Sequence, residues 1–315
     1  MATSGSINFA TSRDDLIKYA LLNVGAIGEG DTPTATQYTD GAVYLNMIMK
    51  AWHNDGMPLW ALKEGYILPV SDTNSVSLGA GGGHATLSYV RTTLGGDEAS
   101  GQTALTVASI TGISASDNLG IELDDGSIQW TTVSGAPSGT TVTAATALTG
   151  AAASGNNVYT YTTKINRPIK ILRASFFNES ANTDTPVEVV THSDLFDISD
   201  KETEGQPNIL WYNPELSLGK ANIYPRFQDG SGVIKIFFQR PIEDFDASGD
   251  EPDCPQEFYM ALLWQLSWSL SPAWSVPIKE RQLFLQEATI LKQQALDFMM
   301  EEGSLRIYPE SNPRG

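Results

Sequence analysis

The 315-residue sequence has a single cysteine, three histidines and no long apolar run. One cysteine, Cys254, excludes an internal disulfide framework and a cysteine-rich metal site. His53, His84 and His192 are far apart in the sequence, so a histidine-based metal site would also need carboxylate ligands. No apolar run approaches the roughly 18 residues that a membrane-spanning helix needs, and residues 1–15 lack the basic and apolar regions of a signal peptide. We therefore expect a protein that is made and folded in a cytoplasm and has no membrane partner.

Positive charge is also scarce. The sequence has 19 lysines and arginines against 37 aspartates and glutamates, a formal net charge of -18. Proteins that bind phosphates gain affinity when Lys and Arg release counterions, so this balance disfavours direct binding of nucleic acid. An acidic surface would suit a passage through which DNA slides without sticking, although solubility is the simpler interpretation.

Signatures of catalysis are missing. The chain has no GxxxxGK[ST], GxGxxG, GxSxG or HExxH motif, and the stretch Gly79–His84 lacks the lysine of a phosphate-binding loop. Four carboxylates in residues 246–253 could bind calcium, but they lack EF-hand spacing, and a solvated loop that caps the following helix is favoured. A helix N-terminus could lower the pKa of Cys254, but a small residue at a helix start is the simpler interpretation. We expect no catalytic residue, no cofactor and no metal, and hence no enzyme.

The two ends of the chain predict helices. Ser12 and Asp15 form a capping-box pattern, and Thr32-Pro33 places a hydroxyl before a proline at a first helical position. Apolar residues then recur every three or four positions. The predicted helices are residues 12–24, 33–54, 255–271 and 277–302.

The middle of the chain predicts β-structure. Between residues 71 and 163, Val, Thr, Ser, Ala and Gly dominate, and short alternating runs are separated by turn residues, as in a small sandwich or barrel. Further strand candidates follow between Lys164 and Ile242. We predict an α+β fold in which a helical bundle built from both chain ends carries an inserted β-rich domain and additional β-strands. The predicted domains are 1–70 with 164–303 (the body), 71–163 (the insert) and 304–315 (a tail).

One hairpin is specified in detail. In Gly120–Gly135 the Asp125-Gly126 pair predicts a two-residue type I′ turn. The predicted cross-strand pairs are Leu123 with Ile128 and Ile121 with Trp130, which would place all four apolar side chains on one face. Val133 would then lie on the opposite face, so the strand is expected to bulge or change partners after Trp130.

Aromatic residues crowd one predicted helix and its exit. Trp264, Trp268 and Trp274 cannot all lie in one stripe with Phe258 and the leucines of that helix. Some of this surface must meet another element of the chain or another subunit, and core packing within the chain is the simpler alternative.

The order of segments resembles a known family. RDDLIKYALLNVGAIGEGDTPTATQYTDGAVYLNMIMKAWHNDG is followed by LWALKEGYIL, a β-insert, RPIKILRASFF, TPVEVVTHSDLFDISDKETEGQPNILWYNPE, ANIYPRF, GVIKIFFQRPIEDFD and PQEFYMALLWQLSWSLSPAW. Over nearly the whole chain this resembles the head-to-tail adaptors, or tail accessory factors, of short-tailed bacteriophages.

The resemblance implies a structural virion protein. It would be made in the cytoplasm of a bacterial host and located at the head-tail junction. Its partners would be the portal protein, a tail tube or nozzle protein, and further copies of itself in a ring of twelve. DNA would pass through the lumen without specific binding. By this resemblance the long helix predicted at residues 277–302 and the tail from Ser304, with Leu305, Arg306, Ile307 and Tyr308, would contact the portal. The β-elements would meet the tail tube or nozzle.

Two other classes stay open. A tail spike, fibre or decoration protein would fit the Thr/Gly-rich strands but would not explain the helical ends. An adaptor with cell-wall hydrolase activity would need an acid and a nucleophile that the sequence does not identify.

Overall fold

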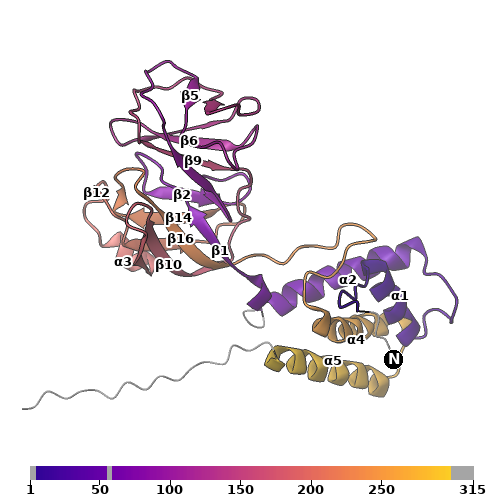
Figure 1. Cartoon of the computed structure of the whole chain (residues 1–315). Helices are drawn as coiled ribbons and strands as arrows, with labels where there is room; N and C mark the ends of the chain where they lie inside the picture. The colour runs from indigo at the N-terminus through magenta and orange to yellow at the C-terminus, as the bar shows by residue number, and fades with distance from the viewer. Residues whose placement is uncertain (1–4, 55–58, 299–315) are drawn as a thin grey trace, which may run out of the picture. The chain divides into compact units, whose positions relative to one another are not determined.

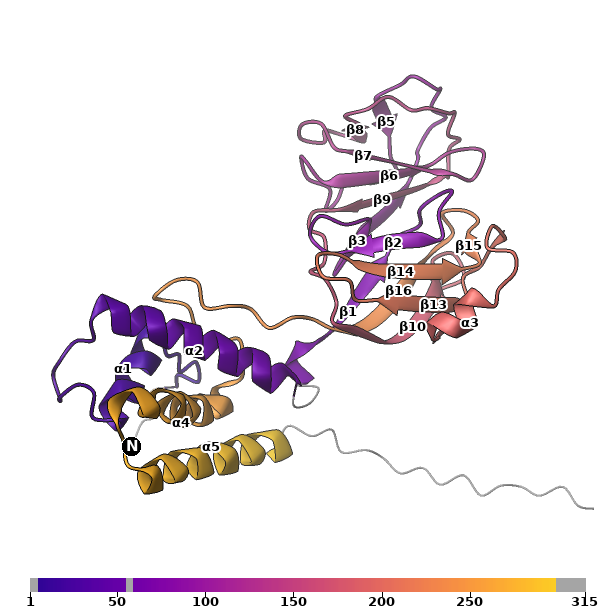
Figure 2. The same cartoon turned by 180° about the vertical axis from the view of Figure 1, so that it is seen from behind.

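The computed structural model describes residues 5–54 and 59–298. Its contacts divide the chain into two compact units, Met1–Trp60 with Ile242–Gly315, and Ala61–Pro241 (Figures 1 and 2). We call them the helical unit and the β unit. The predicted insert boundaries at residues 71 and 163 both fall inside the β unit.

The helical unit holds the long helices of the chain. They are α1 (Arg13–Asn23), α2 (Ala35–Asn54), α4 (Tyr259–Leu270) and α5 (Ile278–Phe298), with short 3-10 turns at Gln256–Phe258 and Ser271–Trp274. Helix α4 contacts α1, α2 and α5, and within this unit it lies between α2 and α5 (Figures 1 and 2). Leu262 and Leu266 of α4 are fully buried against α1 and α2 side chains such as Ile17 and Leu45. Burying apolar area in this way supplies most of the stability of such a unit.

The N-terminus of α1 is capped twice. The Ser12 hydroxyl accepts a bond from the Asp15 amide at 3.2 Å, and the Asp15 carboxylate accepts from Ser12, which confirms the predicted capping box. The carbonyl of Asp250 accepts a bond from the Arg13 amide at 2.7 Å. The acidic loop at residues 246–253 therefore caps α1. The helical segment that follows the loop has no side-chain cap bond at its start.

The largest element of the β unit is an eight-stranded, nearly closed, barrel-like sheet. Its strand order is β2-β14-β13-β11-β10-β16-β1-β3, and only the β11–β13 pair is parallel. The strands are β1 (Leu62–Ile67), β2 (Ser75–Leu78), β3 (Ala85–Thr86), β10 (Lys170–Asn178), β11 (Thr183–Val189), β13 (Ile209–Asn213), β14 (Gly219–Tyr224) and β16 (Gly232–Gln239). The first and last of these in the chain, β1 and β16, are paired neighbours, with Leu62 opposite Gln239.

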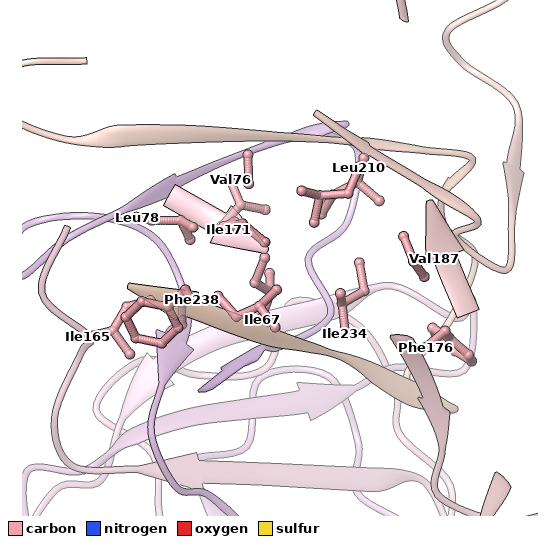
Figure 3. Close-up of a cluster of buried hydrophobic side chains, with 14 of the residues drawn as sticks. Ile67, Val76, Leu78, Ile165, Ile171, Phe176, Val187, Leu210, Ile234 and Phe238 are labelled. Carbon is pink, nitrogen blue, oxygen red and sulfur yellow. The ribbon is translucent and has the colours of Figure 1, made fainter. Parts of the chain in front are cut away.

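The core of this sheet is aliphatic and aromatic. Side chains from strands far apart in the sequence, including Ile67, Ile234 and Phe238, converge on its concave side (Figure 3). Each is at most 1% exposed. Because these contacts join residues more than 150 positions apart, the two halves of the β unit must fold together.

A second, smaller β-module lies within the β unit. A four-stranded sheet runs in the order β4 (Val90–Thr93), β9 (Asn157–Tyr161), β6 (Asn118–Glu122) and β7 (Ile128–Thr132), beside the pair β5 (Ala104–Thr106) and β8 (Thr141–Thr143). We call residues 87–163 the small module. Its own core includes Leu105, Ile121 and Val158. The remaining elements are the pair β12 (Glu204–Gly205) and β15 (Arg226–Phe227) and the short helix α3 (His192–Phe196).

The predicted fold class is wrong. The chain is mostly β, with an eight-stranded sheet, several smaller sheets and only 27% helix, and it is not a helical bundle that carries a β-insert. The sequence prediction places the strands on either side of the small module in the same domain as the helices. They pair instead with one another, β1 with β16 and β2 with β14, and so build the main sheet.

The predicted hairpin register is also wrong. Gly126 has φ +84°, but Asp125 is not in the left-handed region that a type I′ turn requires at both central positions. The Asp125 carboxylate accepts bonds from the amide and hydroxyl of Ser127, and the Leu123 amide donates to the Ser127 carbonyl at 2.8 Å. This three-residue loop shifts the register by one, so that Gly120, not Ile121, lies opposite Trp130.

The shift separates the four apolar side chains between two faces. Ile121 and Leu123 enter the core of the small module, and Val133 joins them there instead of lying on the opposite side. Ile128 and Trp130 lie on the other face, because alternate strand residues point in opposite directions. The hairpin is therefore apolar on both faces.

Candidate functional site

The tail residues that the resemblance assigns to portal contact lie outside the described residues. Leu305, Arg306, Ile307 and Tyr308 belong to the segment after residue 298.

Cys254 has no nucleophilic character in this fold. Burial, reinforced by the charges of Asp253 and Glu257, raises the pKa of its thiol to about 12. The thiol therefore stays protonated near neutral pH, and Cys254 packs against the core of the helical unit beside the turn that precedes α4. His53 lies in the last turn of α2 and is buried.

His84 lies at the joint between the small module and the main sheet. Its ring stacks on Trp130 at a centroid distance of 3.8 Å and an interplanar angle of 10°. Its Nδ1 is 2.9 Å from the hydroxyl of Tyr161. Burial, and secondarily the charge of Lys164, lowers the pKa of the imidazole to about 4. The ring is therefore neutral at pH 7, and its position between two aromatic side chains indicates a structural role.

The same joint contains more aromatic residues, which we call the aromatic seam. Tyr159 and Tyr161 of β9 are buried with Leu68 and Val233 of the main-sheet region, and the partly buried members are Tyr66, Tyr89, Trp130 and Phe177. Trp130 Nε1 donates to the Pro69 carbonyl at 3.0 Å, and the Tyr159 hydroxyl donates to the Gly230 carbonyl at 2.7 Å. The Tyr89 hydroxyl donates to the Glu179 carboxylate. Packing and hydrogen bonds together fix the small module to the main sheet.

A cleft of about 590 Å³ opens at one end of the seam. Hydroxyl side chains dominate its lining, with Asp117 and Lys164 as its charged residues. Asp117 is buried and accepts bonds from the Ser114 amide and the Thr162 hydroxyl. The lining has no histidine or cysteine, and the charged lining groups already have protein partners. The cleft thus offers no nucleophile paired with a base.

Helix α2 exposes apolar side chains on the face away from its core. Val43, Tyr44 and Met47 are 49%, 40% and 62% exposed, whereas Leu45 and Met49 are buried in the unit. We call Val43, Tyr44 and Met47 the α2 stripe. A helix of a free globular protein usually keeps such a face polar, so this surface is a candidate contact.

Helix α5 has a similar surface. Among its described residues only Ala288 and Ala295 are buried, and Trp264 of α4 packs against Phe284 at 5.6 Å. This contact shows that part of the tryptophan-rich surface is covered within the chain. On the opposite face, Leu283 and Ile290 are 59% and 43% exposed and lie two turns apart. We call Leu283 and Ile290 the α5 stripe.

Sequence reasoning missed both stripes. Leu45 and Met49 of α2 are buried in the core, whereas Val43 and Met47 lie on the exposed face. The sequence does indicate the α2 stripe, because apolar residues occupy both faces of a helix over residues 42–49. A helix that packs on one core needs apolar residues on only one face.

Comparison with protein-family models and with curated proteins finds no match for the chain. Among the described residues, no set of three or more His, Cys, Asp or Glu side chains is arranged to hold a metal ion. None of the helices described here combines the length and the hydropathy of a membrane span.

Proposed function

We propose that this protein is a head-to-tail adaptor of a short-tailed bacteriophage, a structural virion protein that forms a ring between the portal and the tail. The proposal starts from the order of sequence segments that resembles this family. The observation that carries it furthest is the pair of uncovered apolar stripes on α2 and α5.

A ring requires two different contact surfaces on each subunit. In a closed ring, one patch of each copy meets a different patch of the next, in contrast to a two-fold dimer, in which the same patch meets itself. The α2 and α5 stripes differ in composition, and the helices that carry them lie on opposite sides of α4 within the helical unit (Figures 1 and 2). This arrangement supports assembly into a ring, for which the family implies twelve copies.

A bridge between a portal and a tail also needs separate surfaces for separate partners. The β unit has its own cores and exposes apolar residues of its own, including Phe196 and Leu216. We assign the tail tube or nozzle to the β unit and the portal to the helical unit with the tail from Ser304. The net charge of -18 supports a lumen through which DNA passes without specific binding.

Electron microscopy of the purified protein mixed with the portal protein of the same virus tests this proposal. We expect a ring stacked on the portal, and the protein alone serves as the control. If folded protein and folded portal fail to associate, the adaptor proposal is wrong, and a spike, fibre or decoration role takes its place.

A second test separates the enzyme alternative. Purified protein added to a suspension of bacterial cell wall is expected to leave the turbidity unchanged. A steady fall in turbidity at a rate proportional to protein concentration would show hydrolysis and would contradict a purely structural role.

A further inference from the structure

The α2 and α5 stripes are flanked by charges in opposite order. On α2, Asp40 precedes the stripe and Lys50 follows it, and both are exposed. The Lys50 side chain, which is ion-paired with Asp244 at 2.7 Å, remains 48% exposed. On α5, exposed Lys279 precedes Leu283, and exposed Glu287 lies between Leu283 and Ile290. Read in the chain direction, α2 therefore runs from negative to positive, and on α5 the cation Lys279, with exposed Glu280 next to it, comes before the acid Glu287.

We propose that the α2 stripe of one copy packs against the α5 stripe of the next copy, with the two helices parallel. This inference rests on the proposed ring, which supplies a second copy as the occupant. Charge complementarity selects the parallel direction. It places Asp40 beside Lys279 and Lys50 beside Glu287, whereas the antiparallel direction would bring Lys50 toward Lys279 and Asp40 toward Glu287.

The spacing of the apolar residues fits the same register. An α-helix rises about 1.5 Å per residue, so Val43 lies about 4.5 Å beyond Asp40, and Leu283 lies about 6 Å beyond Lys279. Met47, about 10.5 Å beyond Asp40, then falls midway between Leu283 and Ile290, which lie at about 6 and 16.5 Å. A side chain that enters the gap between two others is the usual geometry of helix packing. Charge and shape thus specify one alignment.

Cysteine cross-linking tests this alignment in the portal-bound ring. In a Cys254→Ala background, one variant carries Val43→Cys with Leu283→Cys, which are level in the parallel register. Its matched control carries Val43→Cys with Ile290→Cys, which the same register places about 12 Å out of line. Under mild oxidation we expect the first variant to give a ladder of covalent oligomers and the second to stay monomeric on a denaturing gel. A ladder from the second variant but not from the first would show a different register and overturn the proposal.

The outcomes separate this inference from the adaptor function. Rings that form on the portal without a ladder from either pair would overturn the α2–α5 contact and leave the adaptor function intact. If the unsubstituted chain forms no ring on the portal, the adaptor function and the contact that rests on it are both wrong.

Charge reversal provides a second readout that does not depend on cysteine chemistry. Asp40→Lys is expected to lower ring formation about fivefold at low salt, because it faces Lys279 of the next copy. Adding Lys279→Asp to the same chain is expected to restore it. If the double variant assembles no better than Asp40→Lys alone, the two residues do not face each other and the register is wrong.

Discussion

The position of His84 predicts that acid loosens the joint between the small module and the main sheet. The imidazole stacks on Trp130, and its folded-state pKa is about 4 against an ordinary value of 6.5. The unfolded chain therefore takes up the proton first as the pH falls. Stability from the neutral ring is full above pH 6.5 and is lost as the pH falls toward 4.

The expected magnitude follows from these two values. Between pH 7 and pH 5, protonation of the unfolded state alone lowers the free energy of unfolding of the β unit by about 2 kcal/mol. Carboxylates also titrate at the lower end of this range, so the comparison must be made with a variant that lacks the imidazole. His84→Gln keeps a hydrogen-bonding side chain next to Tyr161 but has no proton to gain.

The assay is urea unfolding of the unsubstituted protein and of His84→Gln at several pH values from 7 to 5. Tryptophan fluorescence monitors the unfolding. At pH 7 the variant is expected to be less stable by about 1 kcal/mol, because it loses the stack on Trp130. At pH 5 this difference is expected to vanish or reverse. If the two stabilities fall in parallel over the whole range, His84 is not held neutral by its surroundings and the reasoning is refuted.

Three further predictions concern single residues. Gly120→Ala is expected to destabilise the β unit by about 1–3 kcal/mol, because a Cβ there would lie 2.8 Å from the Trp130 ring. The measurement is thermal unfolding, and the control is Gly81→Ala, whose Cβ would meet nothing within 4 Å. Equal melting temperatures would contradict the close approach. Ser12→Ala is expected to lower the free energy of unfolding of the helical unit by about 1 kcal/mol, because the hydroxyl that caps α1 is lost. Urea unfolding measures this change. An unchanged midpoint would show that the Asp250 carbonyl alone is enough to cap the helix. Cys254 is expected to resist alkylation at pH 8 until the chain is unfolded, as mass spectrometry would show, and rapid modification of the native protein would contradict its raised pKa.

Features that depend on neighbours in the sequence were predicted best. The Ser12–Asp15 cap follows from residues three positions apart, and the structure has α2 at Ala35–Asn54 where residues 33–54 were predicted. The predicted register of the hairpin is wrong by one residue, because the Asp125 side chain binds Ser127 and favours a three-residue loop over the two-residue turn. Such a competition between turn types is decided by a single side-chain hydrogen bond.

Features that depend on distant partners could not be predicted. The fold class was wrong because β1 and β16 pair across some 170 positions, and local alternation does not say which strands meet. The stack of His84 on Trp130 is equally remote from any local pattern. For the candidate contact surfaces, the sequence contained the apolar residues of α2 but not the information on which face α4 covers. The adaptor function itself stays a prediction.

The pairing of β1 with β16 also bears on how this protein could evolve by exchange of its β unit. The first strand of the β unit begins at Leu62 and its last ends at Gln239, two residues that lie directly opposite each other. The two ends of the β unit are therefore only about 5 Å apart there, the distance across one strand pair. Recombination could exchange one β unit for another through this narrow junction without disturbing the helices. Under the proposed adaptor function, a lineage could thus acquire a new tail contact while retaining the same ring.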